Sequence, residues 1–227
     1  MGVDFNQFSV ISGQNLIKRN FQTTGYKLKL SDVTFSYNDA QIVLKNFNLE
    51  VKRGEMLAII GESGAGKTTL LYLMTKLFPP DSGSVEVFGK VAAATSTNYI
   101  FSESIRANFL MLYENISDEE IFFALKICRL DNFDIDANIG EDGANLSGGE
   151  RVRLQIALAI AKNPDVLILD EPTAGLNKNL AENLIAAIVE DCKKNNRTLI
   201  IITHDFLAWK LEPKTWRKVF LSLIPSP

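Results

Sequence analysis

The chain has 227 residues, of which 46% are hydrophobic and 22% charged, as is ordinary for a globular protein of one domain or one and a half. A formal net charge of −3 gives no sign of the basic surface that nucleic-acid binding requires, so we expect no nucleic-acid partner. Cys128 and Cys192 lie far apart and match no metal-ligand spacing, which favours a reducing compartment.

The first part of the chain predicts two strands. Residues 1–24 show no clear hydrophobic period and are interpreted as a lead-in or linker. Apolar and polar residues then alternate over 26–37, with a slip near Ser31, and again over 42–51. This period of two predicts a pair of strands joined by a turn at 38–39.

A glycine-rich loop follows the apolar strand predicted over 56–60 and precedes a helical pattern over 70–78, which two prolines are expected to end. The loop matches G-x-x-x-x-G-K-[ST] without a mismatch, with the residues Gly61, Glu62, Ser63, Gly64, Ala65, Gly66, Lys67, Thr68 and Thr69. Between a strand and a helix, this motif lets backbone N–H groups and a helix dipole converge on a phosphate. Lys67 would place its charge on the β- and γ-phosphates, and the Thr68 hydroxyl would ligate Mg²⁺. The alternative is a glycine-rich turn that matches by chance.

Strands and helices alternate from residue 56 onward, which predicts an α/β fold with a mostly parallel sheet. The later elements are a strand over 84–88, helices over 102–111 and 121–130, a helix over 149–161, a buried strand over 166–169, a helix over 178–194 and a buried strand over 198–203. A capping box at Ser117 to Glu120 marks the start of the second of these helices.

Two carboxylates, Asp170 and Glu171, follow the apolar strand over 166–169. Open α/β sheets bind their ligands at this end of the strands. Asp170 is therefore predicted to hold Mg²⁺, directly or through water. Successive side chains diverge at a strand end, so Glu171 can act on a water that attacks the γ-phosphate. The alternative is a solvated acidic turn.

Two single residues are further candidates for the site. His204 is the only histidine and follows a buried strand at the same predicted sheet edge as Asp170, where it could contact a γ-phosphate. A structural histidine is the alternative. Tyr37 could stack on a purine, and its alternative is a half-buried strand residue.

A second helix start has the sequence Leu146-Ser147-Gly148-Gly149-Glu150. Ser147 and Glu150 have the spacing of a capping box. Ser147 and the N–H groups of Gly148 and Gly149 also predict a second anion-binding helix start. The two interpretations can hold together.

In their order, these motifs resemble the nucleotide-binding domain of ATP-binding cassette (ABC) proteins, over residues 26 to about 206. The resemblance implies a P-loop NTPase fold with a mostly parallel core sheet, an antiparallel β subdomain and an α-helical subdomain. It also implies that two such domains sandwich two ATP molecules with Mg²⁺. Each ATP lies between the phosphate loop of one subunit and the signature turn, Ser147 to Gly149 here, of the other.

The resemblance also implies roles for single residues. Tyr37 would stack on adenine, the loop from Gly61 to Thr69 would hold the phosphates, Glu171 would be the catalytic carboxylate and His204 the switch histidine. Two further runs are similar to exporter-type domains, namely 102–108 (S-E-S-I-R-A-N) and 139–143 (I-G-E-D-G). The second run corresponds to a loop that contacts coupling helices of the membrane domain.

The chain departs from the family pattern in several places. The glutamine of the loop between the subdomains falls on Ser96, and there is no glutamine between residues 41 and 155. Glu150 stands where glutamine is commoner, and Asn177 replaces an aspartate expected at the dimer seam. Residues 211–227 do not show the usual closing strands.

The expected organisation has four segments. These are a lead-in (1–24), the β subdomain with the first part of the core (25–101), the helical subdomain with the signature (102–162) and the second part of the core with the C-terminal segment (163–227).

The expected function is an ATP-hydrolysing domain that dimerises around ATP and drives an exporter-type ABC transporter. A regulatory or degenerate ATP-binding subunit with weak hydrolysis and a soluble non-transport ABC ATPase are the alternatives. No apolar run is long enough to cross a bilayer, and the N-terminus lacks a signal-peptide pattern. The domain is therefore expected at the cytoplasmic side of the membrane, through a membrane-domain partner or as part of a longer membrane protein.

Overall fold

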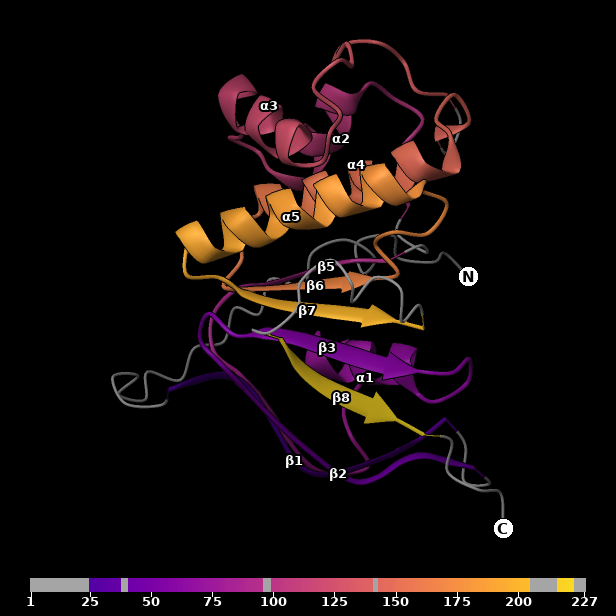
Figure 1. Ribbon diagram of the computed structural model, residues 1–227, viewed down its shortest axis with the longest axis vertical. Coiled ribbons are helices and arrows are strands. Elements are labelled where there is room, and N and C mark those ends of the chain that lie inside the picture. The colour runs from indigo at the N-terminus through magenta and orange to yellow at the C-terminus, as the bar shows by residue number, and fades with distance from the viewer. Residues whose placement is uncertain (1–24, 38–40, 96–98, 141–142, 205–215, 223–227) are drawn as a thin grey trace.

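The computed structural model describes residues 25–37, 41–95, 99–140, 143–204 and 216–222. Two sheets and five helices form its layers (Figure 1). Helices α4 and α5 cover one face of a parallel sheet, with α2 and α3 outside them, and α1 lies between the other face and an antiparallel sheet (Figure 1).

The antiparallel sheet has the order β2-β1-β4, with β1 at Tyr26–Ser36, β2 at Ile42–Lys52 and β4 at Ser82–Val87. The slip predicted near Ser31 is an irregularity in the register between Leu30 and Val33, where Asp32 has a φ of 50°. An extra residue at such a point restores the apolar alternation to the buried face on both sides of it.

The parallel sheet has the order β5-β6-β7-β3-β8. Its strands are β3 (Met56–Gly61), β5 (Val91–Ala94), β6 (Val166–Asp170), β7 (Thr198–Thr203) and β8 (Arg217–Leu221). All four pairings are parallel, so the carboxyl ends of β6, β7, β3 and β8 meet at one edge (Figure 1). That edge carries the residues of the candidate site.

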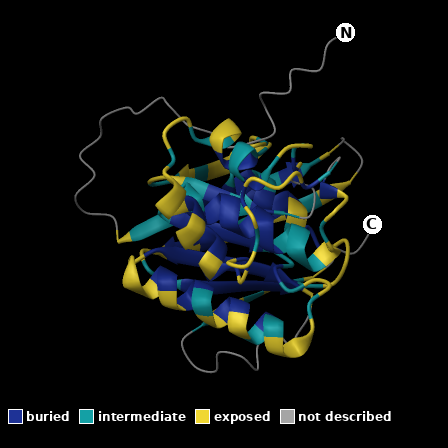
Figure 2. Ribbon diagram, turned by 90° about the horizontal axis from the view of Figure 1, so that it is seen from above, coloured by how far each residue is buried: buried dark blue, intermediate teal, exposed yellow. Residues whose placement is uncertain are grey.

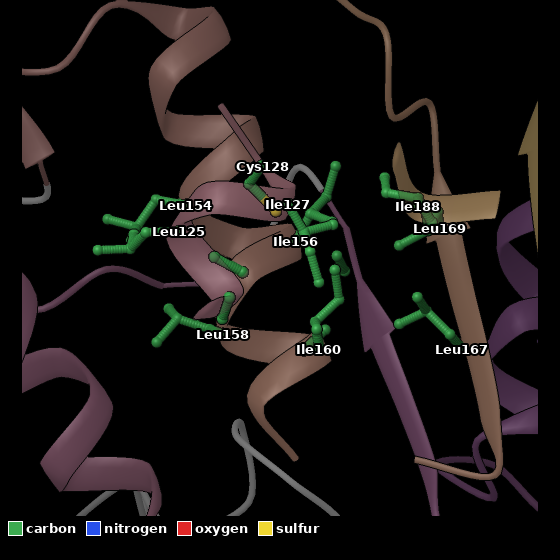
Figure 3. Close-up of a cluster of buried hydrophobic side chains, with 14 of the residues drawn as sticks. Leu125, Ile127, Cys128, Leu154, Ile156, Leu158, Ile160, Leu167, Leu169 and Ile188 are labelled. Carbon is green, nitrogen blue, oxygen red and sulfur yellow. The ribbon is translucent and has the colours of Figure 1, made fainter. Parts of the chain in front are cut away.

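The apolar strands have buried side chains on both faces of the parallel sheet. In β6, Leu167 and Leu169 belong to the core beneath α4 and α5, while Val166 and Ile168 belong to the core around α1. Figure 3 shows the first of these cores, in which side chains of α3 and α4 face those of β6. Buried residues follow the sheet, and exposed residues lie along the outer faces of the helices (Figure 2). A continuous apolar run is what a strand covered on both faces requires.

The helices are α1 (Lys67–Met74), α2 (Ile105–Leu112), α3 (Asp118–Ile127), α4 (Gly148–Ala161) and α5 (Lys178–Lys194). Side chains cap four of them, with Ser104, Ser117, Ser147 and Asn177 accepting the hydrogen bond at their N-termini. Ser117 and Ser147 complete the predicted capping boxes with Glu120 and Glu150. None of these helices is long and apolar enough to cross a membrane, a statement that covers only the described ranges.

Three sequence predictions need correction. The helix predicted over 70–78 is α1, which begins at Lys67 and ends at Met74, well before the prolines, because Lys76 turns the chain with a φ of 59°. Residues 211–227 were expected to lack closing strands, yet they contain β8, which pairs with β3. The short strand β5 has no counterpart in the sequence prediction. The four segment boundaries remain predictions.

A buried ion pair joins the end of α5 to the turn before β7. Arg197 and Asp191 have side chains 4% and 5% exposed, and Arg197 Nη1 lies 2.5 Å from Asp191 Oδ2. Arg197 also donates to Pro164 O at 2.9 Å and to Asn163 Oδ1 at 3.0 Å. Burial raises the pKa of Asp191, although Arg197 opposes this shift. The pair therefore stabilises the fold only while both members are present.

We predict that Arg197→Ala lowers the free energy of unfolding by about 3–5 kcal/mol, because Asp191 would stay buried without its partner. Urea unfolding followed by circular dichroism measures the change. Lys178→Ala is the matched control, since its ion pair with Glu182 is exposed and its loss changes stability by about 0.5 kcal/mol or less. Equal midpoints for the two variants would contradict the prediction.

Candidate nucleotide site

The glycine-rich loop lies between β3 and α1. Gly64 and Gly66 have φ values of 83° and 87°, in the left-handed region that glycine adopts without strain. Among the described residues, no side chain caps the start of α1. The first N–H groups of a helix have no partner within the helix, so they are available to an anion.

Neighbouring strands pack closely against this loop. A Cβ atom on Gly61 would lie 2.8 Å from Leu221 O of β8, and one on Gly66 would lie 3.1 Å from Val43 Cγ1 of β2. A side chain therefore has no room at Gly61, and at Gly66 it would require both a shift of Val43 and a strained backbone. The backbone of the loop is held between the two sheets, with its polar groups at the pocket.

The Lys67 side chain lies back along the loop. Its ammonium group donates to Gly61 O at 2.7 Å and to Glu62 O at 2.9 Å. An ammonium has three donors, so one remains for a phosphate oxygen. The two carbonyl contacts hold the positive charge at the mouth of the loop.

An open pocket of about 1000 Å³ lies over the loop. Of the residues predicted for the site, those that line it are Tyr37, Gly61, Ser63, Gly64, Gly66, Lys67, Thr68, Thr69, Asp170, Glu171 and His204. Ala65 does not line the pocket and is 5% exposed, while its N–H donates to Glu62 O at 3.2 Å. The structure thus brings together the glycine-rich loop and the ends of β6 and β7.

Tyr37 directly follows β1, with 56% of its surface exposed. Tyr37 is thus neither in the strand nor half-buried, unlike the strand residue that was its alternative interpretation. The Tyr37 and Thr69 hydroxyl oxygens lie 3.0 Å apart in a hydrogen bond. The ring therefore lies beside the start of α1, where a base attached to a bound phosphate would be within its reach.

Asp170 is the last residue of β6 and faces the pocket. Burial raises its pKa to about 6, and the neighbouring charge of Glu171 adds to the rise, while Lys67 opposes it. A carboxylate that is costly to ionise alone is stabilised by a cation placed beside it. This environment suits a ligand of a bound metal ion.

Glu171 leaves the sheet in a different direction, because its backbone has a φ of 49°. One oxygen, Oε2, accepts from the Thr203 hydroxyl at 2.9 Å. The other, Oε1, accepts from His204 N at 2.9 Å and lies 2.5 Å from His204 Nδ1. The end of β7 therefore holds this carboxylate.

The turn of Ser147 to Gly149 lies outside this pocket, at the start of α4. Ser147 and Gly148 are exposed, and a Cβ atom on Gly148 would meet no atom within 4 Å. The Ser147 hydroxyl donates to Glu150 Oε2 at 2.7 Å, and Ser147 N donates to the same oxygen at 2.8 Å. These bonds hold the pKa of Glu150 below its ordinary value. The turn thus presents an open surface with a carboxylate next to it.

The loop after Glu171 packs against that turn in the same chain. A Cβ atom on Gly149 would lie 2.6 Å from Leu176 Cδ2 and 3.4 Å from Gly175 O. Asn177, the departure noted in this loop, accepts from Leu180 N at 3.0 Å and caps α5. Asparagine therefore keeps the helix cap while removing the charge of an aspartate. Ser96 lies outside the described residues.

Several residues that line the pocket were not among the individual site residues predicted from the sequence. These are Val43, Ile60, Glu62, Phe220, Leu221 and Ser222. Glu62 occupies a variable position of the motif, and Val43 belongs to a strand of the other sheet. The last three come from the end of β8, which the sequence did not predict as a strand. Only the assembled fold brings them to the loop.

Comparison with known proteins identifies relatives among transporters. The leukotoxin translocation ATP-binding protein LktB of a Pasteurella haemolytica-like species is 32% identical over 197 residues, covering 78% of this chain and 28% of that protein. An ATP-binding/permease protein of Staphylococcus aureus, named for multidrug export, is 31% identical over 204 residues, covering 78% of this chain and 35% of that protein. The chain thus spans about a third of the length of these curated relatives.

A solved structure of a bacterial Atm1-family ABC exporter with ATP bound has a similar fold, with a TM-score of 0.80 and 24% identity. The alignment covers 93% of this chain and 40% of that one. Residues 44–174, more than half of the chain, match the family described as ABC transporter. The chain therefore belongs to the ABC transporter family and corresponds to the nucleotide-binding part of its relatives.

Proposed function

We propose that the chain is the ATP-binding and ATP-hydrolysing domain of an exporter-type ABC transporter and that it works as a dimer. One observation carries this proposal. The glycine-rich loop, Asp170, Glu171 and His204 line one pocket, while the signature turn of the same chain lies outside it. One chain thus has a phosphate pocket at the start of α1 and a separate anion-binding helix start at α4, which a second copy could use.

The phosphates of ATP would bind to the loop amides and to Lys67. Left-handed glycines and the uncapped start of α1 supply N–H donors, and the third donor of Lys67 adds a charge-assisted bond. Tyr37 would stack on the adenine, because its exposed ring lies beside the start of α1. Phosphate and base would then have separate binding elements.

The oxygen donors at the pocket fit Mg²⁺. The Thr68 hydroxyl and the Asp170 carboxylate both line it, and Mg²⁺ favours such ligands together with phosphate oxygens and water. When bound, Mg²⁺ would neutralise charge on the β- and γ-phosphate oxygens.

Glu171 would orient the attacking water and accept its proton. Thr203 and His204 fix the carboxylate from β7, yet its two oxygens have further acceptor capacity for a water. His204 is 68% exposed at its side chain, so its ring can contact the γ-phosphate from the same edge of the sheet. Asp170 and Glu171 would thus act on the metal and on the water respectively.

A second copy would complete the site. Ser147 and Gly148 are exposed and offer a hydroxyl and the amides of a helix start, which suit the γ-phosphate bound by a partner. Binding would require the Ser147 hydroxyl to turn from Glu150 toward the phosphate. ATP would therefore close a head-to-tail pair, and hydrolysis would reopen it.

The helices above the sheet offer a surface for a membrane domain. Leu110 and Met111 of α2 and Phe122 and Phe123 of α3 are each more than two-fifths exposed. Exposed apolar side chains of this size favour a protein partner. Asn108 orders the start of this region by bonding Phe101 N at 2.8 Å and Ser104 O at 3.0 Å. We propose that such a contact would hold the domain to a membrane partner at the cytoplasmic face of the membrane.

A regulatory subunit that binds ATP but hydrolyses it weakly is the second candidate. The absence of glutamine between residues 41 and 155 favours it, since a glutamine contributes to the metal and water site of the family. Asn177, which is neutral where the family has an aspartate in the loop after Glu171, also favours weak hydrolysis. A soluble non-transport ABC ATPase is a third candidate, which linkage to a membrane-spanning partner would exclude.

We predict that Lys67→Ala weakens ATP binding about 10- to 100-fold, because it removes the charged hydrogen bond to the phosphates. Titration calorimetry with Mg-ATP measures the affinity. Lys45→Ala, which removes an exposed lysine from β2, is the control and should bind as the wild type does. Unchanged affinity in a folded Lys67→Ala protein would contradict the phosphate role of the loop.

We also predict that Glu171→Gln lowers ATP turnover at least about 100-fold while Mg-ATP binding persists, since only the acceptor of the water proton is lost. Phosphate release measures turnover, and sedimentation with ATP measures dimer lifetime, which should increase. Glu182→Gln on α5 is the control. Wild-type turnover equal to buffer would favour the regulatory candidate, whereas turnover unchanged by Glu171→Gln would refute the role of this carboxylate.

A further inference from the structure

An aromatic cluster lies between Tyr37 and the end of α1. Phe78 contacts three other rings, with centroid distances of 5.8 Å to Phe35, 6.1 Å to Tyr37 and 5.3 Å to Tyr72. Phe35 is 6% exposed and also contacts Tyr37 at 5.1 Å. Phe78 therefore links the end of α1 to the end of β1 and to Tyr37, which follows it.

The turn at the end of α1 determines where Phe78 lies. Lys76 has a φ of 59°, Lys76 N donates to Leu73 O at 3.1 Å, and Leu77 N donates to Tyr72 O at 2.8 Å. These are the two hydrogen bonds of a Schellman motif, which reverses the chain at a helix end. The reversal brings Phe78 back against the Tyr72 ring and next to β1.

Three contacts fix the Tyr37 ring. Its plane is perpendicular to those of Phe35 and Phe78, at 90° and 87°, in the edge-to-face arrangement that aromatic pairs favour. Its hydroxyl is bonded to Thr69, which lies in α1 and is 3% exposed. More than half of the Tyr37 surface nevertheless stays exposed at the pocket. The ring is thus held in one orientation with surface left for a ligand.

We propose that Phe78 is a positioning residue for purine recognition, acting through Tyr37. This inference rests on the proposed function, in which Tyr37 stacks on the base of ATP. Without the Phe78 ring, Tyr37 would keep its hydroxyl bond but lose an aromatic contact that defines its plane. Stacking would then require the ring to be ordered on binding, while the phosphate loop would be unaffected.

The test compares ATP with inorganic tripolyphosphate, which has the phosphates but no base, both with Mg²⁺ and the whole chain. The dissociation constant for tripolyphosphate divided by that for ATP measures the contribution of the base. We expect Phe78→Leu to lower this ratio about 3- to 10-fold without changing the affinity for tripolyphosphate. Phe78→Tyr, which keeps the ring, should retain the wild-type ratio. Phe88→Leu, at the separate ring pair with Tyr26, is the matched control.

Tyr37→Ala separates this inference from the function on which it rests. A lower ratio in Tyr37→Ala and in Phe78→Leu supports the proposal. A lower ratio in Tyr37→Ala alone refutes the role of Phe78 and leaves the proposed function intact. An unchanged ratio in Tyr37→Ala refutes base stacking and the inference with it. Equal losses of ATP and tripolyphosphate affinity in Phe78→Leu would also refute the proposal, because Phe78 would then only support α1.

Discussion

The site depends on the close approach of three backbone segments at the start of α1. Gly61 lies against Leu221 O of β8, which leaves no space for a side chain, and Gly66 lies against Val43 of β2 with a φ that favours glycine. The loop between them is thereby held with its polar backbone toward the pocket. A triphosphate needs many donors at short range, and backbone amides supply them without the entropy cost of ordering long side chains. The two sheets and α1 together create this condition.

The ends of β6 and β7 add two carboxylates, Asp170 and Glu171, and the groups that separate their roles. Asp170 continues the direction of β6 and is buried enough that its pKa rises to about 6. Glu171 turns away through a left-handed backbone and is fixed by Thr203 and His204 of the neighbouring strand end. Neighbouring carboxylates in one sequence thus acquire different environments. Such a separation lets one group serve a cation and the other a water.

Strong periodicity explains what the sequence predicts well. The observed bounds of α5 and β7 equal the predicted ones, because a long amphipathic helix and a fully apolar strand each have an unambiguous pattern. The short strand β5 is Val-Ala-Ala-Ala, a run too short and too small in its side chains to distinguish a strand from a helix. In β8, Val219 and Leu221 pack inward between exposed residues, but five residues are too few to reveal that alternation.

Local sequence also predicts most of the pocket, because the motif residues are consecutive or directly follow apolar strands. What it omits comes from tertiary packing. Phe220 and Ser222 reach the pocket only because β8 pairs with β3, and Phe78 reaches Tyr37 only because Lys76 reverses the chain. Neither contact can be predicted from the positions of these residues along the chain.

In the proposed dimer, each nucleotide site combines the pocket of one chain with the signature turn of the other. Two inactive variants test it by mixing. Lys67→Ala impairs the pocket but keeps the signature turn, and Gly148→Asp places a carboxylate in the open space of that turn while leaving the pocket intact. Each variant alone should lack ATP turnover, whereas an equal mixture should recover about a quarter of the wild-type rate, because half of the dimers then contain one intact site. A mixture as inactive as its components, or full turnover by Gly148→Asp alone, would contradict the account.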